Sequence, residues 1–133
     1  MAEIKSDEFK VQAGANQVQE FLSDMNNLKE LMASDKIQNW ESDTDTCSFT
    51  IKGLSGIGMR RDNVVPGEQI NIVSHGKNPF DFTLNIDLND EGESSSVQLT
   101  FDGNMNFMIQ TMASGPLKNL FNMMGEQLVK KFS

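Results

Sequence analysis

Tyrosine is absent from this sequence, and cysteine, histidine and tryptophan occur once each. The single thiol, Cys47, excludes an intrachain disulfide and any zinc or iron–sulfur site built from several cysteines. This cysteine usage fits a reducing compartment, so we expect a cytoplasmic protein. Without a phenol, and with His75 as its only imidazole, the chain has few side chains suited to acid–base catalysis.

Long apolar runs and positive charge are also scarce. No segment approaches 18 consecutive apolar residues, so we expect no membrane insertion, and residues 1–12 lack the apolar core of a signal peptide. Lys and Arg number 11 against 19 Asp and Glu, which gives a formal net charge of −8. Because nucleic acids and anionic membrane surfaces attract basic proteins, neither is an expected partner.

The size and composition are those of one globular domain. The chain has 133 residues, of which 38% are hydrophobic and ten are glycine, so residues 1–133 are treated as a single domain. Met and Phe number nine each, which predicts a soft, apolar interior. We expect a monomer with no cofactor and no metal.

The first part of the chain predicts a strand and two short helices. Residues 2–12 mix apolar and charged positions as a strand does, with a kink near Ser6. Asn16 is a plausible N-cap, and apolar residues follow it at i, i+3 and i+4 from Val18 onward. Residues 26–33 repeat that spacing. Neither helix is long enough to be stable alone in water, so both must pack on other elements.

From residue 36 onward the apolar period changes to two, which is typical of strands with one buried face. Six strands are expected, near residues 37–41, 47–52, 59–65, 70–73, 80–88 and 97–105. A glycine-rich bend separates the second strand from the third at residues 53–58. The last two strands have the clearest alternation and are predicted to form an antiparallel hairpin.

Apolar residues in the segment 106–132 return to a spacing of about 3.6, which predicts a long amphipathic helix. Pro116 should kink this helix or divide it in two. Six antiparallel strands with one apolar face need a cover of comparable length, and this helix is the only candidate. The order therefore predicts an α+β domain, β-α-α-β6-α, in which a curved antiparallel sheet wraps a long C-terminal helix.

With this order of elements, the stretches AGANQVQEFLSDMNNLKELM, CSFTIKGLSGIGM and NPFDFTLNIDL resemble the START/SRPBCC superfamily. That group includes birch-pollen-allergen-like proteins, polyketide cyclases and lipid-transfer domains, and the likeness is greatest to small bacterial members of unassigned function. The resemblance covers the whole chain. It implies the helix-grip fold and a cavity between sheet and terminal helix that is often open to apolar ligands. It implies no shared catalytic motif.

Residues in the inward phase of the strands, and on the inner face of the helix, are the expected cavity lining. They are Phe49, Met59, Arg61, Ile72, Phe82, Leu84, Leu99, Phe101, Met105, Met108, Met112, Leu117, Phe121 and Met124. The methionines either adapt to apolar ligands or fill a core, and the second role is the more common. Arg61 could bind a carboxylate or phosphate if it points inward. The bend at 53–58 could instead shift the phase and expose it, which is the favoured interpretation because an unpaired buried charge is unfavourable.

No catalytic residue is expected. His75 alternates outward, and the carboxylates of Asp81, Asp87 and Asp102 lie on the solvated phase of their strands. Cys47 shares the apolar phase and should be buried and inert.

Three functions remain open. The first is binding or carriage of a small hydrophobic molecule such as a lipid, an isoprenoid or a polyketide-like compound. A cyclase or aromatase needs acid–base groups facing the cavity and is disfavoured. A chaperone-associated protein-interaction module would need an exposed apolar patch.

Overall fold

A computed structural model describes residues 2–32, 35–52, 54, 56–76 and 78–133. Within these residues, eight strands form one antiparallel sheet in the order β1-β8-β7-β6-β5-β4-β3, and β2 also pairs with β8. The strands are β1 (Ala2–Lys5), β2 (Phe9–Val11), β3 (Ile37–Ser42), β4 (Thr46–Ile51), β5 (Gly56–Val65), β6 (Gln69–Ser74), β7 (Phe82–Asp90) and β8 (Ser95–Gly103). The helices are α1 (Ala15–Ser23), the 3₁₀ turn η1 (Met25–Asn27), α2 (Leu28–Leu31) and α3 (Phe107–Lys131).

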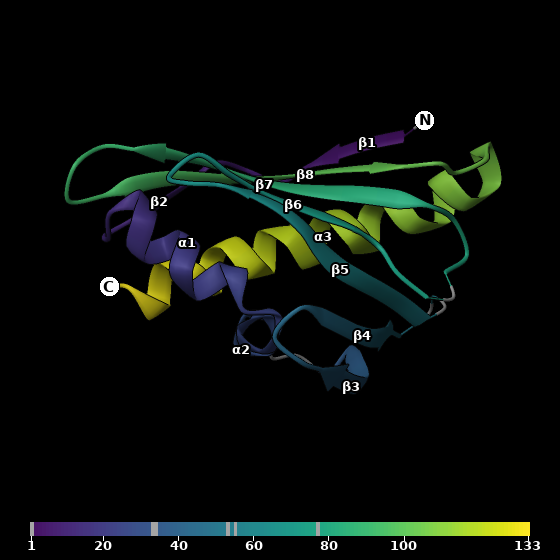
Figure 1. Ribbon diagram of the computed structural model, residues 1–133. Coiled ribbons are helices and arrows are strands. Elements are labelled where there is room, and N and C mark those ends of the chain that lie inside the picture. The colour runs from purple at the N-terminus through teal and green to yellow at the C-terminus, as the bar shows by residue number, and fades with distance from the viewer. Residues whose placement is uncertain (1, 33–34, 53, 55, 77) are drawn as a thin grey trace.

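The predicted helix-grip architecture is confirmed. Helix α3 crosses the molecule between the β7–β8 part of the sheet and the β3–β4 part, which curls around to the other side (Figure 1). Helices α1 and α2 lie beside the C-terminal half of α3 (Figure 1). The sheet therefore encloses α3 on two sides and leaves its N-terminal half at the open end.

The N-terminal strand divides at the predicted kink. Ser6 is buried between β1 and β2, and its hydroxyl oxygen accepts a hydrogen bond from the Leu99 N–H of β8 at 3.0 Å. The Ser6 N–H donates to the Leu99 carbonyl at 2.9 Å. These two bonds hold the chain on β8 where the regular ladder is interrupted.

The two short helices differ from their predicted boundaries. Gly14, with extended backbone, is the N-cap of α1, so the prediction of Asn16 was wrong. The second predicted helix is divided between η1 and α2. The Asp24 side chain caps η1 by accepting from the Asn26 N–H at 3.0 Å. Residue 33, the predicted end of this segment, lies outside the described residues.

The β7–β8 hairpin has the predicted register of a half-buried sheet. Leu84 pairs with Phe101 and Ile86 with Leu99, and apolar residues along both strands are buried at every second position. Such alternation fixes the register, because a slip of one residue would turn the apolar face to water.

Helix α3 is continuous through Pro116, so of the two predicted alternatives the division into two helices was wrong. Proline removes the N–H that would bond to the Met112 carbonyl. Both residues are exposed, so water can hydrate that carbonyl without a break in the helix. Asn106 caps the start of α3 by accepting from the Ile109 N–H at 2.9 Å. Lys130 and Lys131 lie in the last turn, where positive charge suits the helix dipole.

Candidate functional site

Side chains fill the centre of the grip. The Phe101 ring stacks on Phe82 at a centroid distance of 5.1 Å and lies 5.6 Å from the ring of Phe121 on α3. A space of about 10 Å³ remains farther along, lined by Leu22, Leu31, Ile86, Val97, Leu99, Met124 and Leu128. That is about the room one water molecule needs. Among the described residues, core side chains therefore fill the central groove.

Most of the predicted cavity residues lie in this core. Eleven are buried: Phe49, Met59, Ile72, Phe82, Leu84, Leu99, Phe101, Met105, Leu117, Phe121 and Met124. The other two methionines, Met108 and Met112, are 72% and 60% exposed near the start of α3.

Arg61 is held by partners from two other segments. Its guanidinium forms an ion pair with the Asp45 carboxylate and donates to the Ser23 carbonyl at the end of α1. The side chain is 27% exposed. A register shift between Arg61 and Asn63 marks an irregularity in β5 just after it. Arg61 is thus neither an inward anchor nor a free surface charge, because Asp45 neutralises it.

An apolar pocket lies where the N-terminal half of α3 passes the start of β5. We call it the mouth pocket; its volume is about 220 Å³, and it is lined by Leu54, Ile57, Pro79, Phe80, Ile109, Met112, Ala113 and Leu117. Ile109, Ala113 and Leu117 follow each other at i+4 and so share one face of α3. That spacing was a sequence signal that could have identified the pocket. Leu54, Pro79 and Phe80 come from loops. Leu54 and Pro79 had no such signal, and Phe80 was predicted to start the strand that begins at Phe82.

The first turns of α3, which supply part of the mouth pocket, also expose apolar side chains. Phe107, Met108 and Met112 are 85%, 72% and 60% exposed, and they are the large hydrophobic residues that the described chain exposes most. All three lie in the first two turns of α3. Single exposed apolar residues are ordinary, but a cluster beside a pocket is typical of an interaction site.

A second apolar space lies farther along α3, against β3 and β4. We call it the lysine slot; its volume is about 390 Å³, and it is lined by Lys36, Ile37, Ile51, Lys52, Gly115, Pro116, Asn119, Leu120 and Met123. The Lys52 N–H donates to the Lys36 carbonyl at 2.8 Å, next to the Ile37–Ile51 pair. This bond brings the two exposed lysines next to each other among the lining residues.

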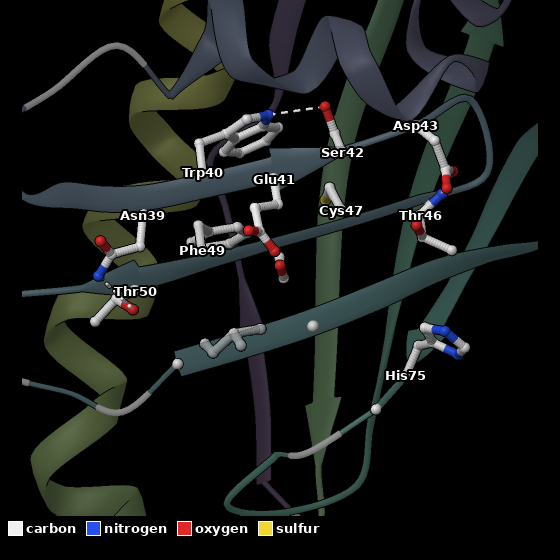
Figure 2. A pocket seen from close by; sticks show the side chains of 15 residues that line it. Asn39, Trp40, Glu41, Ser42, Asp43, Thr46, Cys47, Phe49, Thr50 and His75 are labelled. Carbon is white, nitrogen blue, oxygen red and sulfur yellow. Dashed lines mark hydrogen bonds between the residues drawn. The ribbon is translucent and has the colours of Figure 1, made fainter.

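A broad polar hollow of about 750 Å³ covers the β3–β5 surface (Figure 2). Its lining is Asn39, Trp40, Glu41, Ser42, Asp43, Thr46, Cys47, Ser48, Phe49, Thr50, Gly56, Ile57, Gly58, His75 and Gly76. Gly58 permits the close approach of the His75 backbone, because a Cβ at residue 58 would lie 2.4 Å from the His75 carbonyl oxygen. Trp40 stacks on Phe49 at 5.5 Å and donates from Nε1 to the Ser42 hydroxyl at 2.9 Å.

The titratable groups of the polar hollow do not form an acid–base pair. The Asp43 carboxylate accepts from the N–H groups of Asp45 and Thr46 at 2.9 and 2.8 Å, and these bonds lower the pKa of Asp43. Burial raises the pKa of the Cys47 thiol to about 12, with a smaller contribution from the charge of Asp43. Cys47 is therefore protonated at neutral pH, and it is buried as predicted. His75 lies on a different segment from Asp43 and is exposed (Figure 2).

Across the described residues, no group of three His, Cys, Asp or Glu side chains is placed to hold a metal ion. Within the same part of the chain, no helix combines the length and the apolar character needed to cross a bilayer.

Comparison with solved structures identifies the fold. A START superfamily protein from Mycobacterium smegmatis superposes with a TM-score of 0.69 at 13% identity, over 98% of this chain and 96% of that one. The protein XoxI from Bacillus cereus gives a TM-score of 0.75 at 12% identity, over 99% and 96% of the two chains. A protein from Chromobacterium violaceum gives 0.73 at 15% identity, over 98% and 96%. No family model matches the sequence, and no curated protein sequence matches it. The chain therefore has a START-like fold, as the sequence resemblance implied.

Proposed function

We propose that this protein binds a small apolar molecule in the mouth pocket, at the open end of the grip. The observation that carries the proposal is the pocket of about 220 Å³, whose described lining residues are all apolar and include the exposed Met112. Small-molecule sites are concave and mostly apolar, with volumes of about 300–1,000 Å³. The mouth pocket is smaller, so its ligand is either small or displaces the flexible Met112 side chain.

Among the ligand classes considered from the sequence, a lipid or isoprenoid tail fits this lining best. Among the described residues that line the pocket, no side chain offers a strong hydrogen-bonding group. A polyketide-like compound would bury hydroxyl or carbonyl groups there without partners, which is unfavourable. The same absence of titratable side chains from the pocket lining argues against cyclase chemistry.

A filling variant tests this proposal. Ala113→Leu adds apolar volume from the α3 wall of the mouth pocket, so it should retain the fold and lose binding. The measurement is a panel of short alkanes and isoprenoid alcohols followed through ¹³C-methyl methionine NMR. A ligand in the mouth pocket shifts the Met112 methyl and leaves the methyl of buried Met25 unchanged. Thr111→Leu, at an exposed position of the same helix, is the control. Binding that survives in Ala113→Leu would contradict the proposal.

The exposed cluster of Phe107, Met108 and Met112 supports a second candidate, a protein-interaction module. A partner would cover this cluster and gain from burying its apolar surface. The double variant Phe107→Gln and Met108→Gln separates the two functions, because neither residue lines the mouth pocket. Retained binding of the small molecule with loss of a protein partner would favour the interaction module, and loss of neither would oppose it.

A further inference from the structure

The lysine slot differs from its surroundings in charge. Asp and Glu outnumber Lys and Arg by 19 to 11 in this chain, yet the charged residues lining the slot are Lys36 and Lys52, with no carboxylate among the lining residues. Asp35 precedes Lys36 in sequence but does not line the slot. In the elements that form the walls, β4 has no charged residue, and neither Glu41 of β3 nor Glu126, the one acid of α3, lines the slot.

Below the two lysines the slot is apolar. Ile51 and Leu120 are buried, and Ile37 and Met123 are partly buried against the core. On the α3 wall, Gly115 has open space in front of it, because a Cβ there would meet no atom within 4 Å. Glycine inside a helix is unfavourable, and no neighbour requires it here. Its lack of a side chain leaves the slot open.

The lysine side chains suit the entrance of such a space. Lysine can lay its methylene stem along apolar surface while its ammonium group remains at the mouth. The backbone bond from Lys52 to Lys36 sets the two residues at neighbouring positions, next to the paired ends of β3 and β4. Asn119, exposed on α3, adds an amide donor on the facing wall.

We infer that the lysine slot binds a single-chain amphiphile with an anionic head group. The head group lies between the two lysine ammonium groups, and the tail extends over Ile51 and Leu120 toward Gly115. The slot volume of about 390 Å³ falls within the usual range of about 300–1,000 Å³ for small-molecule sites. The slot has its own lining residues, so this inference does not depend on the mouth pocket.

Three probes with the same tail test the inference: decanoate, decyl phosphate and decan-1-ol, each below its critical micelle concentration. We expect both anions to bind about tenfold or more tightly than the neutral alcohol, because an ionised partner strengthens a hydrogen bond. The comparison of the two anions distinguishes a carboxylate ligand from a phosphate ligand. Binding is measured by calorimetry at two salt concentrations, and the anion affinity should fall as salt rises.

Variants then locate the site. Lys52→Gln should weaken decanoate binding about tenfold and leave decan-1-ol unchanged, whereas Lys118→Gln, at an exposed α3 position outside the slot, should change neither. Lys52 is chosen because Lys36 also makes another interaction. Gly115→Trp should fill the slot and abolish binding of all three probes. Gly115→Ala and Gln110→Trp are the controls for a small side chain there and for a tryptophan elsewhere on α3.

The methionine methyl groups separate this site from the mouth pocket, because Met123 lines the slot and Met112 lines the pocket. Decanoate that shifts the Met123 methyl supports the inference whatever happens at Met112. Equal affinity for decanoate and decan-1-ol would overturn it, as would unchanged decanoate binding in Lys52→Gln or in a folded Gly115→Trp variant. A shift confined to Met112 would also overturn it and leave the mouth-pocket proposal standing.

Discussion

Two glycines of α3 have opposite surroundings. A Cβ on Gly125 would lie 2.1 Å from ring atoms of Phe9, whereas a Cβ on Gly115 would meet no atom within 4 Å. Gly125 therefore permits the close approach of β2 to α3, and Gly115 borders empty space. The sequence pattern around the two glycines could not predict this difference, because it depends on which residues of other elements pack against each glycine.

Alanine substitutions should expose this difference. Gly115→Ala should stabilise the protein by about 0.5–1 kcal/mol through helix propensity. Gly125→Ala gains the same propensity, but overpacking against Phe9 costs about 1–3 kcal/mol, so its net effect should be destabilising. Urea unfolding monitored by circular dichroism measures both, and Phe9→Leu should partly restore Gly125→Ala. Equal effects at the two positions would show that Phe9 does not pack on Gly125.

Cys47 predicts a pH dependence of stability. Burial raises the pKa of this thiol from 9.0 to about 12 in the folded protein. At pH values between these two pKa values, the folded state keeps the thiol proton that the unfolded state has lost. This contribution is fully present below pH 9.0 and is lost as pH rises toward 12. The loss is at most about 1.4 kcal/mol per pH unit.

The measurement is the free energy of unfolding at pH 8, 9 and 10 for the wild type and for Cys47→Ala. The wild type should lose more stability than the variant over this range, because other titrating groups are common to both. A thiol reagent at pH 8 should react with Cys47 far more slowly in the native protein than in urea. Parallel pH profiles and rapid native labelling would contradict burial of the thiol.

At the scale of elements, strong periodicity was enough to predict the β7–β8 hairpin and α3. Both have long runs of regular pattern. In the hairpin the buried residues occupy every second position, and in α3 they recur about every third to fourth position. The short helices were harder to bound, because a single turn such as α2 depends on tertiary packing and on the Asp24 cap. The division predicted as one alternative at Pro116 was wrong for a local reason: the effect of a proline depends on whether the freed carbonyl reaches water, which the sequence does not show.

Pro116→Ala should stabilise α3. The substitution restores an N–H that can bond to the Met112 carbonyl and removes the ring clash of a proline in a helix interior, worth about 3 kcal/mol in reference helices. Proline also restricts the unfolded chain, and loss of that restriction reduces the gain in stability by about 1 kcal/mol. We therefore expect a net gain of about 1–2 kcal/mol, measured as a higher melting midpoint. No gain would mean that solvation of the Met112 carbonyl already compensates for the missing bond.

At the scale of the whole molecule, the sequence predicted a sheet around a helix and left open whether the space between them is filled. The inward phase of a strand identifies residues such as Phe101 and Leu84, but a core and a cavity have the same pattern. Side-chain volumes decide between them. Here the Phe82, Phe101 and Phe121 rings occupy the centre. The two apolar spaces described lie beside α3, at its N-terminal half and against β3 and β4.

If side chains alone close the central groove, removal of one should open it. Met124 is 1% exposed and borders the space of about 10 Å³ between α3 and the sheet. Met124→Ala should lower the free energy of unfolding by about 2–5 kcal/mol, because it removes buried apolar contacts and leaves a cavity. Benzene should then bind the variant and raise its melting midpoint, as an apolar ligand does in a dry engineered cavity. The exposed Met108 provides the control, since Met108→Ala should change stability by less than about 0.5 kcal/mol and create no benzene site. A loss in Met124→Ala without benzene binding would mean that the sheet collapses onto α3, so that the fold maintains a closed grip even when its filling is reduced.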